Sequence, residues 1–74
     1  MMAEADQIEA DSILLVLNQR EAEALLALLY HVGGDPNGPR GDSEAVGTAL
    51  REAGVARRRE LIPEGSSIYM KDKW

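Results

Sequence analysis

The apolar residues of this chain change their spacing near residue 18, which separates a predicted strand from a predicted helix. Residues 12–18 form a short apolar run rich in branched side chains, and a run of this length is typical of a buried strand. Over residues 19–32 the apolar positions instead recur at i, i+3 and i+4, which predicts an amphipathic helix. The apolar stripe of this helix comprises Ala22, Leu25, Leu26, Leu29 and Val32.

Signals at both ends support this first helix. Asn18 is a favoured N-cap residue, and Glu21, three positions later, predicts a variant of the capping box. Gly33 stands where a left-handed residue commonly ends a helix, and Pro36 prevents continuation.

The apolar arc of the first helix is broader than a small sheet would cover, because further apolar residues flank the stripe. They are Ala24, Ala27, Leu28 and Tyr30. We therefore expect one part of the arc to pack on a second helix and another part on a second copy of the chain.

The second helix is predicted from Asp42 or Ser43, both good N-cap residues, to about Ala53, where Gly54 supplies another left-handed end signal. Its apolar face comprises Ala45, Val46, Ala49, Leu50 and Ala53. Because these residues are small and Gly47 lies among them, we expect the two helices to approach closely.

The C-terminal third predicts two short strands around a turn. Residues 60–66 indicate a short strand that ends in a Pro-Glu-Gly turn, and residues 67–74 indicate a final strand. In the final strand Ile68 and Met70 share one face, and Tyr69 and Lys71 share the other. The predicted order is β-α-α-β-β. The fold class is therefore α+β, a single small oligomeric domain over residues 12–74 with an antiparallel sheet packed on a helical hairpin.

Composition restricts how so small a chain is stabilised. It has 74 residues and no cysteine, hence no disulfide, and a single histidine, which excludes a Cys/His zinc site. Apolar residues make up 45% of the chain, so association between copies is the remaining common route to stability. We expect a homo-oligomer that uses no metal and no cofactor.

Charge is concentrated near the N-terminus. The net charge is −5, and the first 29 residues hold six acidic side chains against Arg20. We interpret residues 1–11 as a disordered acidic tail; the alternative is a segment that mimics nucleic-acid charge. An acidic chain argues against binding of a nucleic-acid polymer. No apolar run approaches the roughly 20 residues that cross a bilayer, and no signal peptide is recognised, so we expect no membrane partner and a cytoplasmic location.

Residues 31–43 are the main candidate for ligand chemistry. The segment is rich in glycine and leads into a predicted helix N-terminus, an arrangement that favours bound anions. Arg40 stands two residues before the predicted cap, where its guanidinium would pair with a phosphate. The segment lacks the Lys-Ser/Thr ending of a P-loop and the spacing of a Rossmann turn. The alternative is structural, since the loop would then simply end one helix and cap the next.

Three further features have both a binding and a structural interpretation. The three arginines at 57–59 would recognise phosphate, or be solvated beyond a helix C-terminus. Tyr69 and Lys71 would stack on a base and contact a phosphate, or cover the edge of the sheet. His31 would act as a base or be a packed side chain; no spacing supplies it with catalytic partners, so we do not expect an enzyme. The predicted ligand-binding residues are Gly33, Gly34, Pro39, Arg40, Gly41, Asp42, Ser43, Tyr69 and Lys71.

Three segments resemble small bacteriophage proteins. They are the Leu-Leu-Tyr-His-Val-Gly-Gly-Asp-Pro of residues 28–36, the Gly-Pro-Arg of residues 38–40 and the Gly-Ser-Ser-Ile-Tyr-Met-Lys of residues 65–71. In size and layout, over roughly residues 12–72, the chain is similar to viral nucleotide sponges. Those sponges are oligomers that sequester the cyclic nucleotide signals of bacterial antiviral immunity, of the kinds made in CBASS and Thoeris defence. No ligand contact is carried over from that family to a residue of this chain.

The resemblance implies a phage-encoded immune-evasion protein in the host cytoplasm. It would bind a cyclic nucleotide or a cyclic ADP-ribose-type ligand at subunit boundaries without cleaving it. The loop amides and Arg40 would hold the phosphates, and Tyr69 or Trp74 would stack on a base. The alternative is a phage protein that acts through its oligomeric helical surface, as a protein-binding inhibitor or an accessory assembly protein.

Overall fold

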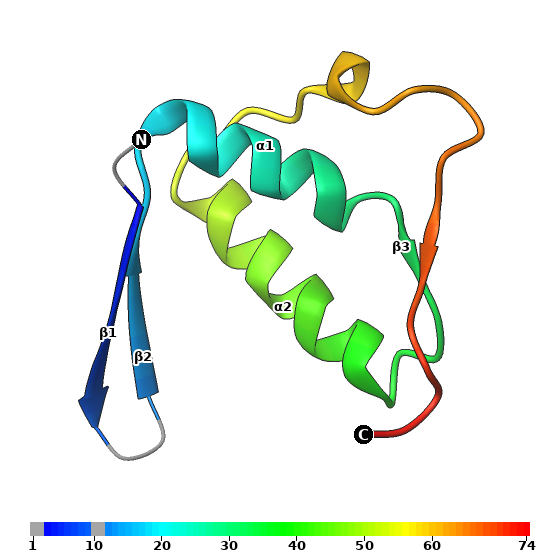
Figure 1. Ribbon diagram of the computed structural model, residues 1–74, viewed down its shortest axis with the longest axis horizontal. Helices are drawn as coiled ribbons and strands as arrows, with labels where there is room; N and C mark the ends of the chain where they lie inside the picture. The colour runs from blue at the N-terminus through cyan, green and yellow to red at the C-terminus, as the bar shows by residue number, and fades with distance from the viewer. Residues whose placement is uncertain (1–2, 10–11) are drawn as a thin grey trace.

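Two helices lie side by side at the centre of the computed structural model, which describes residues 3–9 and 12–74 (Figure 1). A β-hairpin stands on one side of the helices, and the C-terminal segment runs along the other. The elements are β1 (Glu4–Glu9), β2 (Ser12–Val16), α1 (Gln19–Leu29), β3 (Val32–Gly33), α2 (Pro39–Glu52), the 3₁₀ helix η1 (Arg59–Leu61) and β4 (Ile68–Tyr69). The predicted α+β class and the predicted pair of helices are confirmed.

Helix α1 begins where the sequence predicts. The Asn18 side chain accepts a hydrogen bond from the Glu21 N–H at 2.8 Å, and the Glu21 carboxylate accepts one from the Asn18 N–H at 3.0 Å. This reciprocal capping box satisfies two donors that an uncapped helix would leave open. The helix ends at Leu29 rather than at Val32, with Tyr30 as its C-cap. The predicted end is wrong because Val32–Gly33 pairs as a strand with Ile68–Tyr69.

Helix α2 begins earlier than predicted, with an N-cap four residues before Asp42. Its N-cap is Gly38 and its first residue is Pro39, whose fixed φ and missing N–H suit the first turn of a helix. Asp42 and Ser43 therefore lie inside the helix and are not N-caps. The other end is predicted correctly, because Ala53 is the C-cap and Gly54 has φ +92°, the left-handed value that ends many helices.

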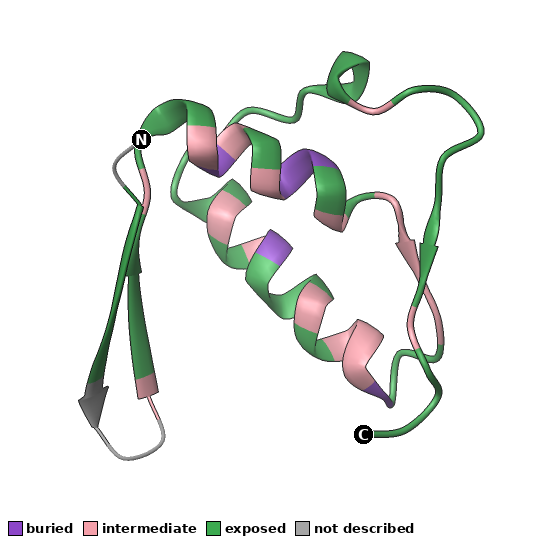
Figure 2. Cartoon of the chain, in the orientation of Figure 1, coloured by how far each residue is buried: buried purple, intermediate pink, exposed green. Residues whose placement is uncertain are grey.

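The described core lies where α1 and α2 meet. Its buried apolar residues are Ala22, Leu26 and Ala27 of α1, and Gly47 of α2 is buried opposite them (Figure 2). A Cβ at Gly47 would lie 3.7 Å from the Leu29 Cβ, at ordinary van der Waals distance, so α1 lies directly against this turn of α2. The predicted apolar face of α2 is largely wrong: Ala45, Val46, Ala49 and Ala53 are exposed, and Gly47 is the helical residue buried against α1.

The strands form two separate two-stranded sheets in place of the single antiparallel sheet that the sequence predicts. Strand β2 pairs antiparallel with β1, whereas β3 pairs parallel with β4. The strand expected within residues 60–66 is the 3₁₀ helix η1 instead. The turn after it is confirmed, since the Ser66 N–H donates to the Pro63 carbonyl at 3.3 Å and Gly65 has φ +82°.

The acidic N-terminus also differs from the expected disordered tail. Residues Glu4–Glu9 form β1, whose register with β2 runs from Glu4 opposite Val16 to Gln7 opposite Ile13. The pairing gives the backbone of these residues hydrogen-bond partners despite their charge. Met1, Met2, Ala10 and Asp11, which belong to the same predicted tail, lie outside the described residues.

Gly33 is not the left-handed residue that the sequence predicts. It lies in β3, and Gly34 takes the positive φ, at +137°. Within residues 3–9 and 12–74, no helix combines the length and the apolar character needed to cross a membrane.

Candidate functional site

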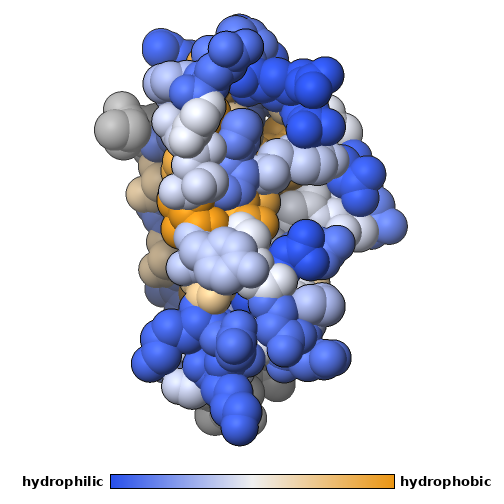
Figure 3. Space-filling model, turned by 90° about the vertical axis from the view of Figure 1, so that its right-hand side faces the viewer, coloured by the Kyte–Doolittle hydropathy of each residue, from blue (hydrophilic) through white to orange (hydrophobic). Residues whose placement is uncertain are grey.

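The C-terminal segment lies along the glycine-rich loop. The Ile68 N–H donates to the His31 carbonyl at 3.1 Å, and the Met70 N–H donates to the Gly33 carbonyl at 2.9 Å. Farther along, the Trp74 indole N–H donates to the Asp42 carboxylate at 2.9 Å. Figure 3 views the molecule from this side and shows apolar surface near the middle, surrounded by hydrophilic side chains. The loop therefore contacts the C-terminal segment of its own chain.

The glycines of the loop make room for this segment and for the turn before α2. A Cβ at Gly38 would collide with the backbone carbonyl of Asp72, and a Cβ at Gly41 would collide with that of Pro36. At Gly33 a Cβ would lie 2.8 Å from the Tyr69 ring. These contacts give the glycines a structural role that the sequence interpretation left as the alternative to ligand binding.

The amides at the start of α2 are largely engaged within the chain. The Gly38 N–H donates to the Asp35 carbonyl at 2.9 Å, and the Gly41 N–H donates to the Gly38 carbonyl at 3.0 Å. Pro39 has no N–H. A set of backbone donors aimed at one anion, as in phosphate-binding loops, is therefore not formed by Gly38, Pro39 and Gly41.

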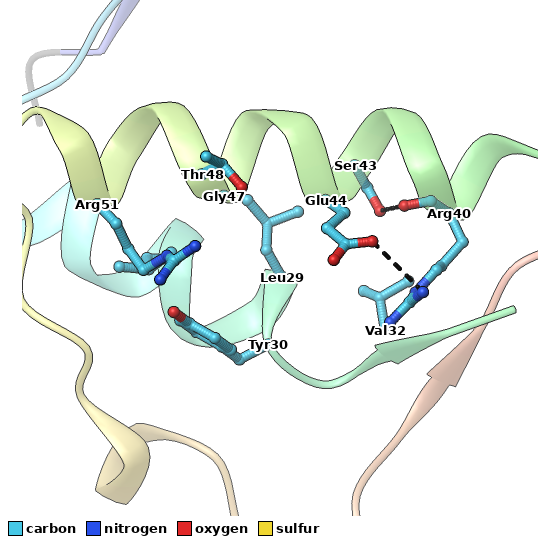
Figure 4. A pocket seen from close by; sticks show the side chains of 10 residues that line it. Leu29, Tyr30, Val32, Arg40, Ser43, Glu44, Gly47, Thr48 and Arg51 are labelled. Carbon is cyan, nitrogen blue, oxygen red and sulfur yellow. Dashed lines mark hydrogen bonds and ion pairs between the residues drawn. The ribbon is translucent and has the colours of Figure 1, made fainter. Parts of the chain in front are cut away.

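A groove of about 200 Å³ lies between the two helices, next to the loop (Figure 4). Its apolar part is formed by Leu26, Leu29 and Val32. Its polar side chains come from successive turns of α2 and include two arginines, two hydroxyl groups and one carboxylate. They are Arg40, Ser43, Glu44, Thr48 and Arg51.

Cations outnumber anions in and beside the groove. Arg40 forms an ion pair with Glu44 at 3.4 Å, one helical turn away, and the Ser43 hydroxyl donates to the Arg40 carbonyl at 2.9 Å. The Arg51 guanidinium carbon lies 6.0 Å from the centre of the Tyr30 ring, and that of Arg57 lies 3.9 Å from it. Two guanidinium groups thus surround an aromatic ring that itself lines the groove.

The next arginine of the basic triplet, Arg58, pairs with acidic side chains and not with the Tyr30 ring. Arg58 forms an ion pair with Glu23 of α1 at 2.9 Å and a second one with Glu60. Its hydrogen bond with Glu60 raises the pKa of Arg58 and lowers the pKa of Glu60. Of the three arginines, Arg57 stacks on Tyr30 and Arg58 fastens η1 to α1, so these two have structural partners.

The predicted site residues divide into three groups. Arg40 and Ser43 line the groove, whereas Gly33, Gly34, Pro39, Gly41 and Asp42 belong to the loop and the first turn of α2. Tyr69 is 80% exposed on β4, and Lys71 follows it as an exposed residue. The structure brings Arg40 next to Gly34, since a Cβ on Gly34 would lie 3.1 Å from the Arg40 Cβ.

Four polar or aromatic groove residues were missed from the sequence. They are Tyr30, Glu44, Thr48 and Arg51. The three from α2 follow Arg40 at helical spacing, so they share a face with it once the helix starts at Pro39. A start at Asp42 or Ser43 left Arg40 outside the helix and concealed this pattern. Among residues 3–9 and 12–74, no cluster of three or more His, Asp or Glu side chains is placed to hold a metal ion.

Comparisons of the chain with protein-family models, with curated proteins and with solved structures give no match. The site is therefore interpreted from its own geometry.

Proposed function

We propose that this protein binds a cyclic nucleotide and sequesters it without cleaving it, as a phage-encoded immune-evasion protein in the cytoplasm of an infected bacterium. The observation that supports binding is the groove between α1 and α2, where Arg40 and Arg51 lie with the Tyr30 ring on an apolar floor. The resemblance to nucleotide sponges supplies the ligand class.

The groove offers each kind of contact that a nucleotide needs. A guanidinium group pairs with phosphate oxygens through two parallel hydrogen bonds, and Arg40 and Arg51 both present one. The Thr48 hydroxyl lines the groove and provides a neutral donor, whereas the Ser43 hydroxyl, which donates to the Arg40 carbonyl, provides an acceptor. Leu29 and Val32, which are half-buried, provide the apolar surface for a base or a sugar.

The Glu44 carboxylate already pairs with Arg40, so a bound phosphate must compete with it. The Glu44 side chain is 60% exposed, so water can solvate its carboxylate once the pair is broken. Breaking an exposed pair of this kind costs about 0–1 kcal/mol, which is less than a charge-assisted contact to phosphate returns. A phosphate would therefore displace Glu44 from Arg40.

The groove is too small for a complete cyclic dinucleotide or trinucleotide. Its volume is about 200 Å³, whereas sites that enclose small molecules have about 300–1,000 Å³. One protomer would hold a phosphate and the adjoining part of the ligand, and a second copy would supply the remaining wall. This agrees with the expectation of a site at a subunit boundary.

Thermal unfolding with added ligand tests the proposal. We expect one member of a panel of cyclic dinucleotides, cyclic trinucleotides and cyclic ADP-ribose isomers to raise the Tm. A ligand at a hundredfold excess over its Kd stabilises the native state by about 2.7 kcal/mol, a shift of many degrees in a domain of this size. The same ligand should be recovered chemically unchanged after incubation. A panel without any Tm shift, or with a cleaved ligand, would overturn the proposal.

Two variants of one ion pair locate the site. Arg40→Gln should weaken ligand binding at least tenfold, because it removes the charge that faces the phosphate. Glu44→Gln removes only the competitor of that phosphate and should strengthen binding several-fold. Both lose the same exposed ion pair, so their Tm values without ligand should agree within the effect of about 0.5 kcal/mol expected for such a pair. Equal ligand affinities in the two variants would place the site elsewhere.

A further inference from the structure

The β1–β2 hairpin stands apart from the helices. Figure 1 shows it beside the two helices, joined to the start of α1. Its apolar side chains are correspondingly exposed: Ile13 is 65% exposed, and Leu14 and Leu15 are each 49% exposed. A two-stranded hairpin without a packed face is at best marginally stable in water, so this element needs a partner.

The two faces of the hairpin differ in charge. Residues opposite one another in an antiparallel pair share a face, and faces alternate along each strand. Among the side chains that the structure describes, one face therefore carries Ala5 with Leu15 and Gln7 with Ile13, none of them charged. The other face carries Glu4 with Val16 and Asp6 with Leu14. We call the first of these the uncharged face and the second the acidic face.

The identity of the partner follows from charge and surface area. A symmetric contact between two acidic faces would place carboxylates against carboxylates, whereas two uncharged faces meet without repulsion. The chain exposes 5823 Å², and a folded monomer of its mass of 8.1 kDa is expected to expose only about 4,500 Å². The excess is larger than the roughly 800 Å² that each partner contributes to an interface of standard size. The chain as a whole therefore has enough excess surface for an interface of standard size, and the exposed aliphatic side chains of the hairpin are part of it.

We propose that the uncharged face of the β1–β2 hairpin is a homodimer interface, on which the same face of a second copy packs as in a two-layer sandwich. Ile13 and Leu15 form its apolar centre, and Ala5 permits close approach of the two sheets. This interface differs from the helical contact expected from the sequence, and it does not depend on a nucleotide.

Mass measurement of the full chain without nucleotide tests this interface. We expect sedimentation velocity and light scattering at micromolar concentration to give twice the chain mass. Leu15→Lys should raise the dimer Kd at least a hundredfold, because it buries an ammonium group against its symmetry mate. Leu14→Lys is the matched control, since Leu14 is equally exposed, lies next to Leu15 in the strand and faces Asp6 on the acidic side. That variant should remain a dimer.

The remaining outcomes would contradict the proposed interface. A wild-type chain that is monomeric throughout the micromolar range overturns the proposal, and so does a Leu15→Lys chain that stays dimeric. Loss of the dimer in both variants also overturns it and indicates pairing through the open edges of the strands. Ile13→Lys is the second test of the uncharged face, and circular dichroism of each variant verifies that the helices are retained. Nucleotide binding is measured separately, so failure of either proposal leaves the other testable.

Discussion

Single residues in this protein are constrained mainly by how close two backbones must come. The backbone carbonyl of Asp72 lies close to Gly38, and that of Pro36 lies close to Gly41. Helix α1 packs against Gly47. The three positions differ in what an added methyl group would meet, since backbone atoms block the first two while Gly47 has only ordinary van der Waals neighbours.

Substitution by alanine should therefore have opposite effects at two of these positions. Gly47→Ala should stabilise the protein by about 1 kcal/mol, because alanine favours a helix interior and its Cβ would lie 3.7 Å or more from its neighbours. In a domain of this size that raises the Tm by about 4–8 °C. Gly38→Ala should lower the Tm, because the Asp72 backbone must move. Thermal unfolding followed by circular dichroism measures both, and an unchanged Tm for Gly38→Ala would contradict the described path of residues 68–74.

Sequence reasoning succeeds at this scale where the cause is local. The Asn18–Glu21 capping box, the end of α2 at Gly54 and the turn at Gly65 each depend on residues a few positions apart. Gly33 was predicted as a ligand-binding residue because its real neighbour, Tyr69, is distant in the sequence. Asp42 is a similar case: it was predicted as a cap, but its carboxylate accepts the Trp74 indole N–H instead.

The elements are joined by a few polar contacts as well as by the small helical core. Arg58 is the clearest example, because it connects η1 to α1 through Glu23 and is also paired with Glu60. All three side chains reach solvent, so the contribution to stability is small and sensitive to salt.

The Arg58 contact predicts a dependence on pH. The hydrogen bond with Arg58 lowers the pKa of Glu60 below its ordinary value of 4.5, so the ionised form is favoured in the folded state. Its contribution is complete above the unfolded pKa and is lost as the pH falls through the folded value. Arg58→Gln should therefore lower the Tm slightly at pH 7 and not at pH 3. Glu60→Gln should abolish most of the same difference, and an equal effect of Arg58→Gln at both pH values would contradict the assignment.

The prediction of helices and strands failed where a weak local sequence signal competed with contacts between residues distant in the sequence. Pro39 and Asp42 both signal a helix start, and proline at the first position is the one that the loop geometry selects. Strand β4 lies within the final strand predicted over residues 67–74, although it is only two residues long, whereas the two-residue β3 is too short for any periodicity to indicate. Strand β1 was missed because its charge suggested a tail, while its alternation of Ala5 and Gln7 with acidic residues carried the pattern of a strand with one uncharged face.

At the scale of the whole molecule, exposed apolar surface is the main feature. The buried apolar side chains of the described residues are few, and the hairpin adds aliphatic residues that the monomer leaves in water. The broad apolar arc of α1 led the sequence analysis to expect association between copies, and the exposed hairpin supplies a second reason for the same proposal. Neither the hairpin nor its uncharged face could be predicted without the register of β1 on β2.

If stability depends on the dimer, the unfolding temperature must depend on protein concentration. We expect the Tm of the wild-type chain to rise by several degrees over a hundredfold increase in concentration, because mass action favours the associated native state. The Leu15→Lys chain should have a lower Tm that is independent of concentration. Differential scanning calorimetry at several concentrations measures this, and a constant wild-type Tm would show that folding and association are uncoupled.

The parallel pairing of β3 with β4 also determines the order in which the chain can fold. Val32 pairs with Ile68, so this small sheet closes a loop that contains the whole of α2 and η1. Closing such a loop costs entropy that only two hydrogen-bonded residue pairs and the neighbouring contacts repay. The two helices, which are close in sequence, form contacts of low sequence separation and assemble first. The C-terminal segment then docks last, so its release leaves the contact between the two helices intact.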